Sequence, residues 1–234
     1  MPNPTEGNPP PFLRGEGDSA TRVVVAPDSF GAFLRTLPLL PPGPKVHLYD
    51  GREKPRQDVH VAVVDLDVPP RDLQQCADAV MRLWAEYQYS QAHEVTFHPE
   101  PAAPAHALVY RGPFGAEAAA RKAFAHWLIR LFASAGSASL QAELQPVAGM
   151  IQPGDVLVQG GYPGHAVLVL DVAADASGHR WLLLGQSYMP AQQFHVLVDP
   201  ASRSPWFDGA ALRTPKGLET PEWRPFHARD LRRF

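Results

Sequence analysis

Hydrophobic residues recur at helical spacing in three stretches of the chain. Residues 29–37 place four apolar side chains on one face of a short helix. The strongest pattern covers residues 72–87, with Asp72 at its cap or in its first turn, and another covers residues 117–134 and stops before Gly136. The chain is therefore expected to contain at least three helices.

Short runs of apolar and β-branched residues predict strands along the rest of the chain. After residue 153 they follow one another closely, divided by glycine-rich turns, which is typical of a meander. The expected strands cover residues 21–26, 46–49, 59–66, 155–159, 165–172, 181–186 and 194–198. Helices in the middle of the chain and a meander after them indicate an α+β fold rather than alternating strands and helices.

Composition shifts only at the N-terminus. Residues 1–20 contain five prolines and three glycines, and we expect them to form a flexible N-terminal segment. Residues 21–234 contain no linker-like stretch, so we expect a single domain there. Over all 234 residues, the 26 prolines favour short elements joined by stiff loops and argue against a long helical bundle.

Charge and hydropathy exclude several classes of protein. With 21 Lys and Arg against 24 Asp and Glu, the formal net charge is −3, so no nucleic-acid partner is expected. No apolar stretch approaches the ~20 residues of a membrane span. The first residues lack the basic and apolar regions of a signal peptide, so we expect a cytoplasmic protein, with an envelope location left open.

Cys76 is the only cysteine, so the chain can form neither an intrachain disulfide nor a cysteine-based zinc site. It lies near the start of the second predicted helix, where free N–H groups and the positive end of the helix dipole lower a thiol pKa. It also belongs to the apolar stripe of that helix, and free cysteines are often buried. Taken alone, this segment favours a buried structural cysteine over a nucleophile.

His165 and Gln186 lie at the ends of two successive predicted strands. His165 opens one strand and Gln186 closes the next, and in an antiparallel pair these two positions face each other. Gln186 could then accept the Nδ1–H of His165 and fix its tautomer, which suits a general base. Alternatively, His165 is a structural histidine at a turn, bonded to a backbone carbonyl, and Gln186 is a polar residue that caps a strand end. With Cys76 added, the three residues form a Cys-His-polar arrangement that is typical of nucleophilic catalysis.

The turn at residues 160–164 precedes His165 and contains three glycines and a proline. Glycines allow a close approach by backbone or substrate, so this turn is expected to form one wall of a cleft. A glutamine beside the cysteine is a candidate oxyanion donor. The candidate substrate-binding residues are Gln75, Gly161, Tyr162, Gly164 and Tyr188.

Three histidines fall close together in the irregular stretch 91–116, at His93, His98 and His106. Their spacing matches no known ligand pattern, and the surrounding prolines favour a surface loop. We therefore expect no metal site, and no motif implies a cofactor.

Two segments resemble the papain-like cysteine hydrolases of the NlpC/P60 and CHAP type. In those families a helix starts at the catalytic cysteine, a Gly-Asp pair opens a strand, and the histidine opens the next one. Pro153-Gly-Asp-Val-Leu-Val and Gly164-His-Ala-Val-Leu-Val stand in those places here. The resemblance implies a papain-like core in which the helix carrying Cys76 packs on an antiparallel sheet.

Longer motifs resemble an uncharacterised bacterial family, domain of unknown function 4846. They start at Ser29 (Ser-Phe-Gly-Ala-Phe-Leu), Gln75 (Gln-Cys-Ala-Asp-Ala-Val-Met), Gly154 (Gly-Asp-Val-Leu-Val-Gln-Gly-Gly-Tyr-Pro-Gly-His-Ala-Val) and Gln186 (Gln-Ser-Tyr-Met-Pro-Ala-Gln). This resemblance covers most of the chain. It brings no established activity, so a mechanism has to come from the residues.

These observations leave two functions open. In the first, the protein is a cysteine peptidase or amidase that cleaves amide bonds in peptides or peptidoglycan-type peptides. Cys76 would attack, His165 would act as base and then acid, and Gln186 would orient His165. In the second, the protein is a catalytically inactive binding domain of the same fold with a buried structural Cys76.

Overall fold

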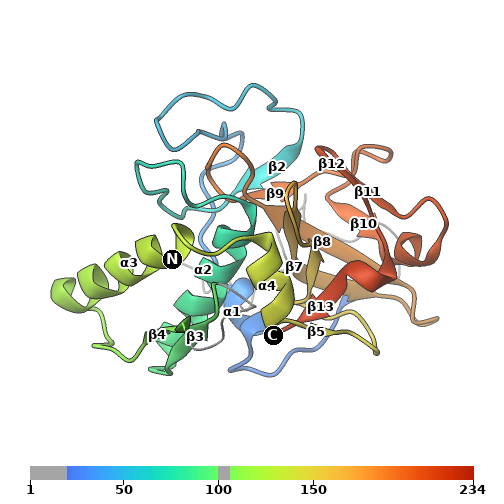
Figure 1. Ribbon diagram of the computed structural model, residues 1–234. Coiled ribbons are helices and arrows are strands. Elements are labelled where there is room, and N and C mark those ends of the chain that lie inside the picture. The colour runs from blue at the N-terminus through green and yellow to red at the C-terminus, as the bar shows by residue number, and fades with distance from the viewer. Residues whose placement is uncertain (1–19, 100–105) are drawn as a thin grey trace.

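A computed structural model describes residues 20–99 and 106–234 (Figure 1). The expected flexible segment, residues 1–20, lies outside the described residues except for Ala20. The predicted α+β class is confirmed: a few helices accompany one large antiparallel sheet. In Figure 1 the helices gather on the left of the view and the C-terminal strands on the right.

The large sheet is ordered β2-β9-β8-β7-β6-β13-β5, with β1 added to β7 and β10 added to β8. Its long central strand, β7, pairs with β6 and β8 on either side. Two further pairs, β3 with β4 and β11 with β12, form separate hairpins. The strands are β1 Thr21–Arg22, β2 His60–Val63, β3 Val95–Phe97, β4 Leu108–Tyr110, β5 Gln145–Pro146, β6 Val156–Gln159, β7 His165–Ala174, β8 Arg180–Gln186, β9 His195–Leu197, β10 Trp206–Asp208, β11 Leu218–Thr220, β12 Trp223–Phe226 and β13 Leu231–Arg233.

Helix α2 packs directly against β7 and against the other helices. Two short 3₁₀ helices, η3 and η4, lie among the C-terminal strands. The helices are α1 Phe30–Leu34, α2 Cys76–Ser90, α3 Ala118–Phe132, α4 Ser137–Glu143, η3 Gly209–Arg213 and η4 Ala228–Asp230.

Alternation along β7 divides the core into two clusters, one on each face of the sheet. Ala166 and Leu168 pack with α2 and α3, whereas Val167 and Val169 pack with η3, the β11–β12 hairpin and β13. This alternation is the period of two that strand geometry imposes. It decides which face each functional side chain occupies.

The strongest predicted helix begins four residues later than expected. Asp72 does not cap it, because its Oδ1 accepts from the backbone N–H of Ala191 at 2.7 Å and from Nε2 of Gln75 at 3.0 Å. Gln75 is the N-cap, and Cys76 is the first residue of α2. A tertiary contact thus replaces the local cap that the sequence indicated.

Several strands differ from the sequence prediction. The stretch 91–116, expected to be irregular, contains the β3–β4 hairpin, and its tip at residues 100–105 lies outside the described residues. The expected strand at 46–49 makes only isolated bridges. Near the C-terminus, β13 inserts between β6 and β5, where Arg233 binds the buried carboxylate of Asp155 at 2.6 Å and 2.9 Å. Strands of two or three residues carry too little alternation to predict.

Substitution of Gly185, next to Gln186, tests how closely side chains pack at the end of β8. A Cβ at Gly185 would lie 2.5 Å from Cε1 of Phe194 and 2.7 Å from Cδ1 of Leu170. We expect Gly185→Ala to lower the free energy of unfolding by about 1–3 kcal/mol, because these core side chains must shift. Gly149→Ala, where nothing lies within 4 Å, is the control and should change it by less than about 0.5 kcal/mol. Chemical denaturation measures both, and equal values for the two variants would contradict the packing described here.

Candidate functional site

His165 and Gln186 are brought together where β7 starts and β8 ends. Nε2 of His165 lies 2.8 Å from Oε1 of Gln186, and both side chains are buried. The contact between the two residues agrees with the strand-end argument, but the nitrogen differs. Nδ1 was expected to donate to Gln186, whereas in the structure Nε2 faces it.

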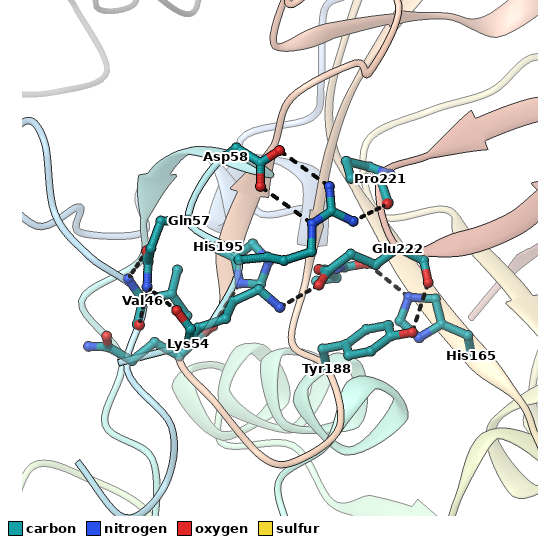
Figure 2. Close-up of polar contacts among 12 residues, drawn as sticks. Val46, Lys54, Gln57, Asp58, His165, Tyr188, His195, Pro221 and Glu222 are labelled. Atoms are coloured by element: carbon teal, nitrogen blue, oxygen red, sulfur yellow. Dashed lines mark hydrogen bonds and ion pairs between the residues drawn. The ribbon is translucent and has the colours of Figure 1, made fainter. Parts of the chain in front are cut away.

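An ion pair behind Gln186 fixes the direction of its amide. Nζ of Lys54 lies 2.6 Å from Oε1 of Glu222, and Nε2 of Gln186 donates to Oε2 of Glu222 at 3.0 Å. A carboxylate only accepts hydrogen bonds, so the NH₂ of Gln186 must face Glu222 and its oxygen must face His165. Figure 2 shows Lys54, Glu222 and His165 in this order along one polar chain.

This arrangement decides the tautomer of His165. Because Gln186 offers an acceptor, Nε2 carries the hydrogen and Nδ1 keeps its lone pair. No hydrogen-bond partner for Nδ1 is found in the described part of the chain, although the atom is buried. Burial lowers the pKa of His165 to about 4, with the nearby charge of Lys54 acting in the same direction and the hydrogen bond to Gln186 opposing it. His165 is therefore a neutral imidazole with an unused basic nitrogen.

Aromatic residues close the site. The ring of His165 lies 5.0 Å from that of Trp223, 5.1 Å from that of Tyr188 and 6.3 Å from that of Phe226, measured between centroids. Trp223 and Phe226 belong to the β11–β12 hairpin, and the Tyr188 hydroxyl donates to the backbone carbonyl of Glu222 in the same hairpin at 2.8 Å. The hairpin thus lies over the imidazole.

Cys76 is also buried, with 4% of its surface exposed. Desolvation raises the pKa of its thiol to about 11, and the charge of Asp78 acts in the same direction. The backbone N–H of Ala166 opposes this, which places the sulfur beside the residue that follows His165. The helix start therefore does not lower the thiol pKa, because burial outweighs it, and Cys76 is buried as the apolar stripe of the segment indicated.

The thiol and the imidazole are neighbours without a direct link. Ala166 packs toward α2, whereas the His165 side chain packs toward the β11–β12 hairpin. No hydrogen bond joins Sγ of Cys76 to Nδ1 of His165. In this state the structure holds a neutral thiol beside a neutral imidazole rather than an ion pair.

The candidate substrate-binding residues are placed in different ways. Tyr188 lies against His165, as described above, and Gln75 binds Asp72 through its Nε2 at 3.0 Å. Tyr162 is fully exposed at the tip of the glycine-rich turn. The carbonyl of Gly161 accepts from the hydroxyl of Ser137 at 3.0 Å.

Gly164 is buried, whereas residues 161–163 of the same turn are exposed. A Cβ there would collide with the Ser137 hydroxyl and lie 2.6 Å from the carbonyl oxygen of Gly161. Close packing therefore requires this glycine.

Lys54, Glu222 and Trp223 were missed by the sequence analysis. Lys54 lies in a polar loop, and Glu222 and Trp223 lie at the turn of a hairpin too short to predict. Only the turn-forming Pro221 before Glu222 could have pointed to this region. Within the described residues, no group of three or more His, Cys, Asp or Glu side chains is placed to hold a metal ion, and no helix is long and apolar enough to cross a membrane.

Comparison with known proteins identifies a family for this chain. No curated protein and no solved structure matches it significantly. A family profile described as domain of unknown function (4846) matches residues 17–106 and 107–233, which span nearly the whole chain. The protein therefore belongs to the family of domain of unknown function 4846.

Proposed function

We propose that this protein is a cysteine hydrolase with a papain-like core that cleaves amide bonds in peptides or peptidoglycan-type peptides. The observation that carries the proposal is the buried imidazole of His165. Its Nε2 is held by Gln186 at 2.8 Å, and its Nδ1 has no hydrogen-bond partner in the described residues. A buried basic atom without a partner is costly, and a role in catalysis is one reason for such an atom to be kept.

The reaction follows the order expected for an activated thiol. Once the hairpin has moved, Nδ1 of His165 takes the proton of Cys76 through one intervening water molecule as Sγ attacks the carbonyl carbon of the scissile amide. The C–N bond then breaks, the imidazolium protonates the leaving amine, and a thioester remains on Cys76. Water, deprotonated by His165, attacks the thioester and releases the acid and the free thiol. Gln186 orients His165 and accepts from Nε2 throughout.

Two groups beside Cys76 are suited to stabilise the oxyanion. Cys76 is the first residue of α2, so its backbone N–H lacks an intrahelical acceptor. Gln74 is fully buried, and its Oε1 accepts from Arg82 at 2.7 Å, which leaves its Nε2 as a donor without a partner among the described residues. Unused donors of this kind suit a charge that develops only in the transition state.

The β11–β12 hairpin has to move before a substrate can reach His165. With the hairpin in place, the pKa of Cys76 is about 11 and that of His165 about 4, so proton transfer between them is unfavourable. Trp223 and Tyr188 both lie against His165, and Tyr188 is near enough to Cys76 for their charges to interact. We expect that displacing the hairpin admits water or substrate to this group and relieves the desolvation that causes both shifts. We therefore assign the described structure to a closed, resting state.

A second candidate function is a non-catalytic binding domain. The burial of Cys76 and its raised pKa favour it directly, because a reactive cysteine is ordinarily exposed and has a lowered pKa. In that case the polar chain from Lys54 to His165 serves only to hold the hairpin on the sheet. The following two experiments separate the candidates.

The direct test is amide cleavage. A mixture of N-acetylated peptides is incubated with the wild-type protein and with Cys76→Ala, and new amino groups are identified by mass spectrometry. We expect cleavage products from the wild type and a loss of at least about 10³-fold in Cys76→Ala, since the nucleophile is removed. Cleavage that persists in Cys76→Ala would exclude Cys76 as the nucleophile. No cleavage by either the wild type or Trp223→Ala would favour the binding domain.

The second test is alkylation of the single cysteine with iodoacetamide. The wild type should react slowly at neutral pH, with a rate that rises toward about pH 11, because the thiolate is the reactive form. Trp223→Ala should raise the rate at neutral pH at least about tenfold, since hydration returns the thiol toward its ordinary pKa of ~8.5.

Trp181→Ala is the matched control, because Trp181 lies at the other end of β8. It should leave the alkylation rate unchanged, and circular dichroism should confirm that both variants remain folded. If Trp223→Ala is folded but no more reactive than Trp181→Ala, the hairpin does not gate Cys76.

A further inference from the structure

A cavity of about 540 Å³ lies beside the His165 site, between α4, the end of β6, β12 and η4. Most of the residues that line it have polar side chains, and they come from segments far apart in the sequence: Gln141, Gln159, Arg224, His227, Arg229 and Asp230.

Gln159 and Trp223 separate this cavity from the imidazole. Gln159 is the antiparallel partner of His165, so the two side chains emerge on the same face of the sheet. Nε1 of Trp223 donates to Oε1 of Gln159 at 2.9 Å, and the Trp223 ring lies 5.0 Å from that of His165. A ligand in the cavity would therefore lie next to a group bound at His165.

The side-chain amide of Gln159 forms hydrogen bonds with other residues of the cavity wall. Its Oε1 also accepts from Nε of Arg224 at 2.6 Å, and its Nε2 donates to Oδ2 of Asp230 at 2.9 Å and to the carbonyl of Pro225 at 3.0 Å. Oδ2 of Asp230 further accepts from the backbone N–H of His227 at 2.9 Å. The carboxylate of Asp230 is thus engaged in holding the wall.

The polar groups of the cavity that remain without a hydrogen-bond partner are donors. Both terminal nitrogens of Arg224 have no protein partner in the described part of the chain. Arg229 is largely exposed and touches Asp230 only at 3.9 Å. Oε1 of Gln141 accepts from the backbone N–H of Gly160 at 2.8 Å, which leaves its Nε2 free to donate. Two guanidinium groups face one carboxylate, so the cavity has an excess of positive charge.

We propose that this cavity binds a carboxylate of the substrate, so that the hydrolase acts on acidic peptides. The guanidinium groups of Arg224 and Arg229 bind the carboxylate, and Gln141 donates a further hydrogen bond. The assignment of the cavity as a substrate subsite rests on the proposed hydrolase function. The carboxylate is either an acidic side chain or a free C-terminus, and the two sources share the same chemistry.

The test measures binding of three peptides to the Cys76→Ala protein, which cannot turn them over. The peptides are acetyl-Ala-Glu-Ala-amide, acetyl-Ala-Gln-Ala-amide and acetyl-Ala-Gln-Ala with a free C-terminus. We expect one of the two carboxylate peptides to bind at least about tenfold more tightly than the neutral one, and salt should reduce this difference. Which of the two binds identifies the source of the carboxylate.

Variants locate the site. Added to Cys76→Ala, Arg224→Gln and Arg229→Gln should each reduce the affinity for the carboxylate peptide at least about tenfold more than the affinity for the neutral peptide. Arg213→Gln, an exposed arginine outside the cavity, is the matched control and should have no effect. Equal binding of all three peptides, binding of none of them, or affinity that is insensitive to both arginines overturns the proposal.

The outcomes also separate this inference from the proposed function. Wild-type cleavage of neutral and acidic peptides at equal rates would retain the hydrolase and reject the carboxylate subsite. Carboxylate-selective binding without any cleavage by the wild type or Trp223→Ala would retain the cavity as an anion site and reject the hydrolase.

Discussion

The buried ion pair between Lys54 and Glu222 is the constraint on which the site depends. Both side chains are less than a tenth exposed, so neither charge can be left alone without a large desolvation cost. The pair fixes the Glu222 carboxylate, which fixes the amide of Gln186, which in turn fixes the tautomer of His165. One electrostatic contact between a loop and a hairpin thereby sets the direction of three hydrogen-bonded groups.

The same contact also explains why the site is closed. Glu222 lies at the turn of the β11–β12 hairpin, so the ion pair that orients Gln186 also holds Trp223 against His165. The orientation of Gln186 and access to His165 therefore depend on the same hairpin. The neighbouring cavity shares this wall, because Trp223 and Arg224 are both bound to Gln159. A ligand there would act on the residues that cover His165.

The sequence predicted the α+β class, the meander and the meeting of His165 with Gln186, since long apolar strands fix their own alternation and order. It could not predict that α2 starts at Cys76, because Asp72 is diverted to the backbone of Ala191. The apolar stripe of this helix did indicate a buried Cys76, and the packing of α2 against β7 accounts for that burial. Lys54 and Glu222 come from segments 168 residues apart, and no local pattern pairs them.

The protonation state of His165 tests this account most directly. In ¹⁵N-labelled protein, long-range ¹H–¹⁵N spectra distinguish a protonated from an unprotonated ring nitrogen. The account predicts a neutral ring with the hydrogen on Nε2, which stays neutral from neutral pH down to about pH 4 and loses this single tautomer in Gln186→Leu. A hydrogen on Nδ1, or protonation of the ring near its ordinary pKa of about 6.5, would contradict it.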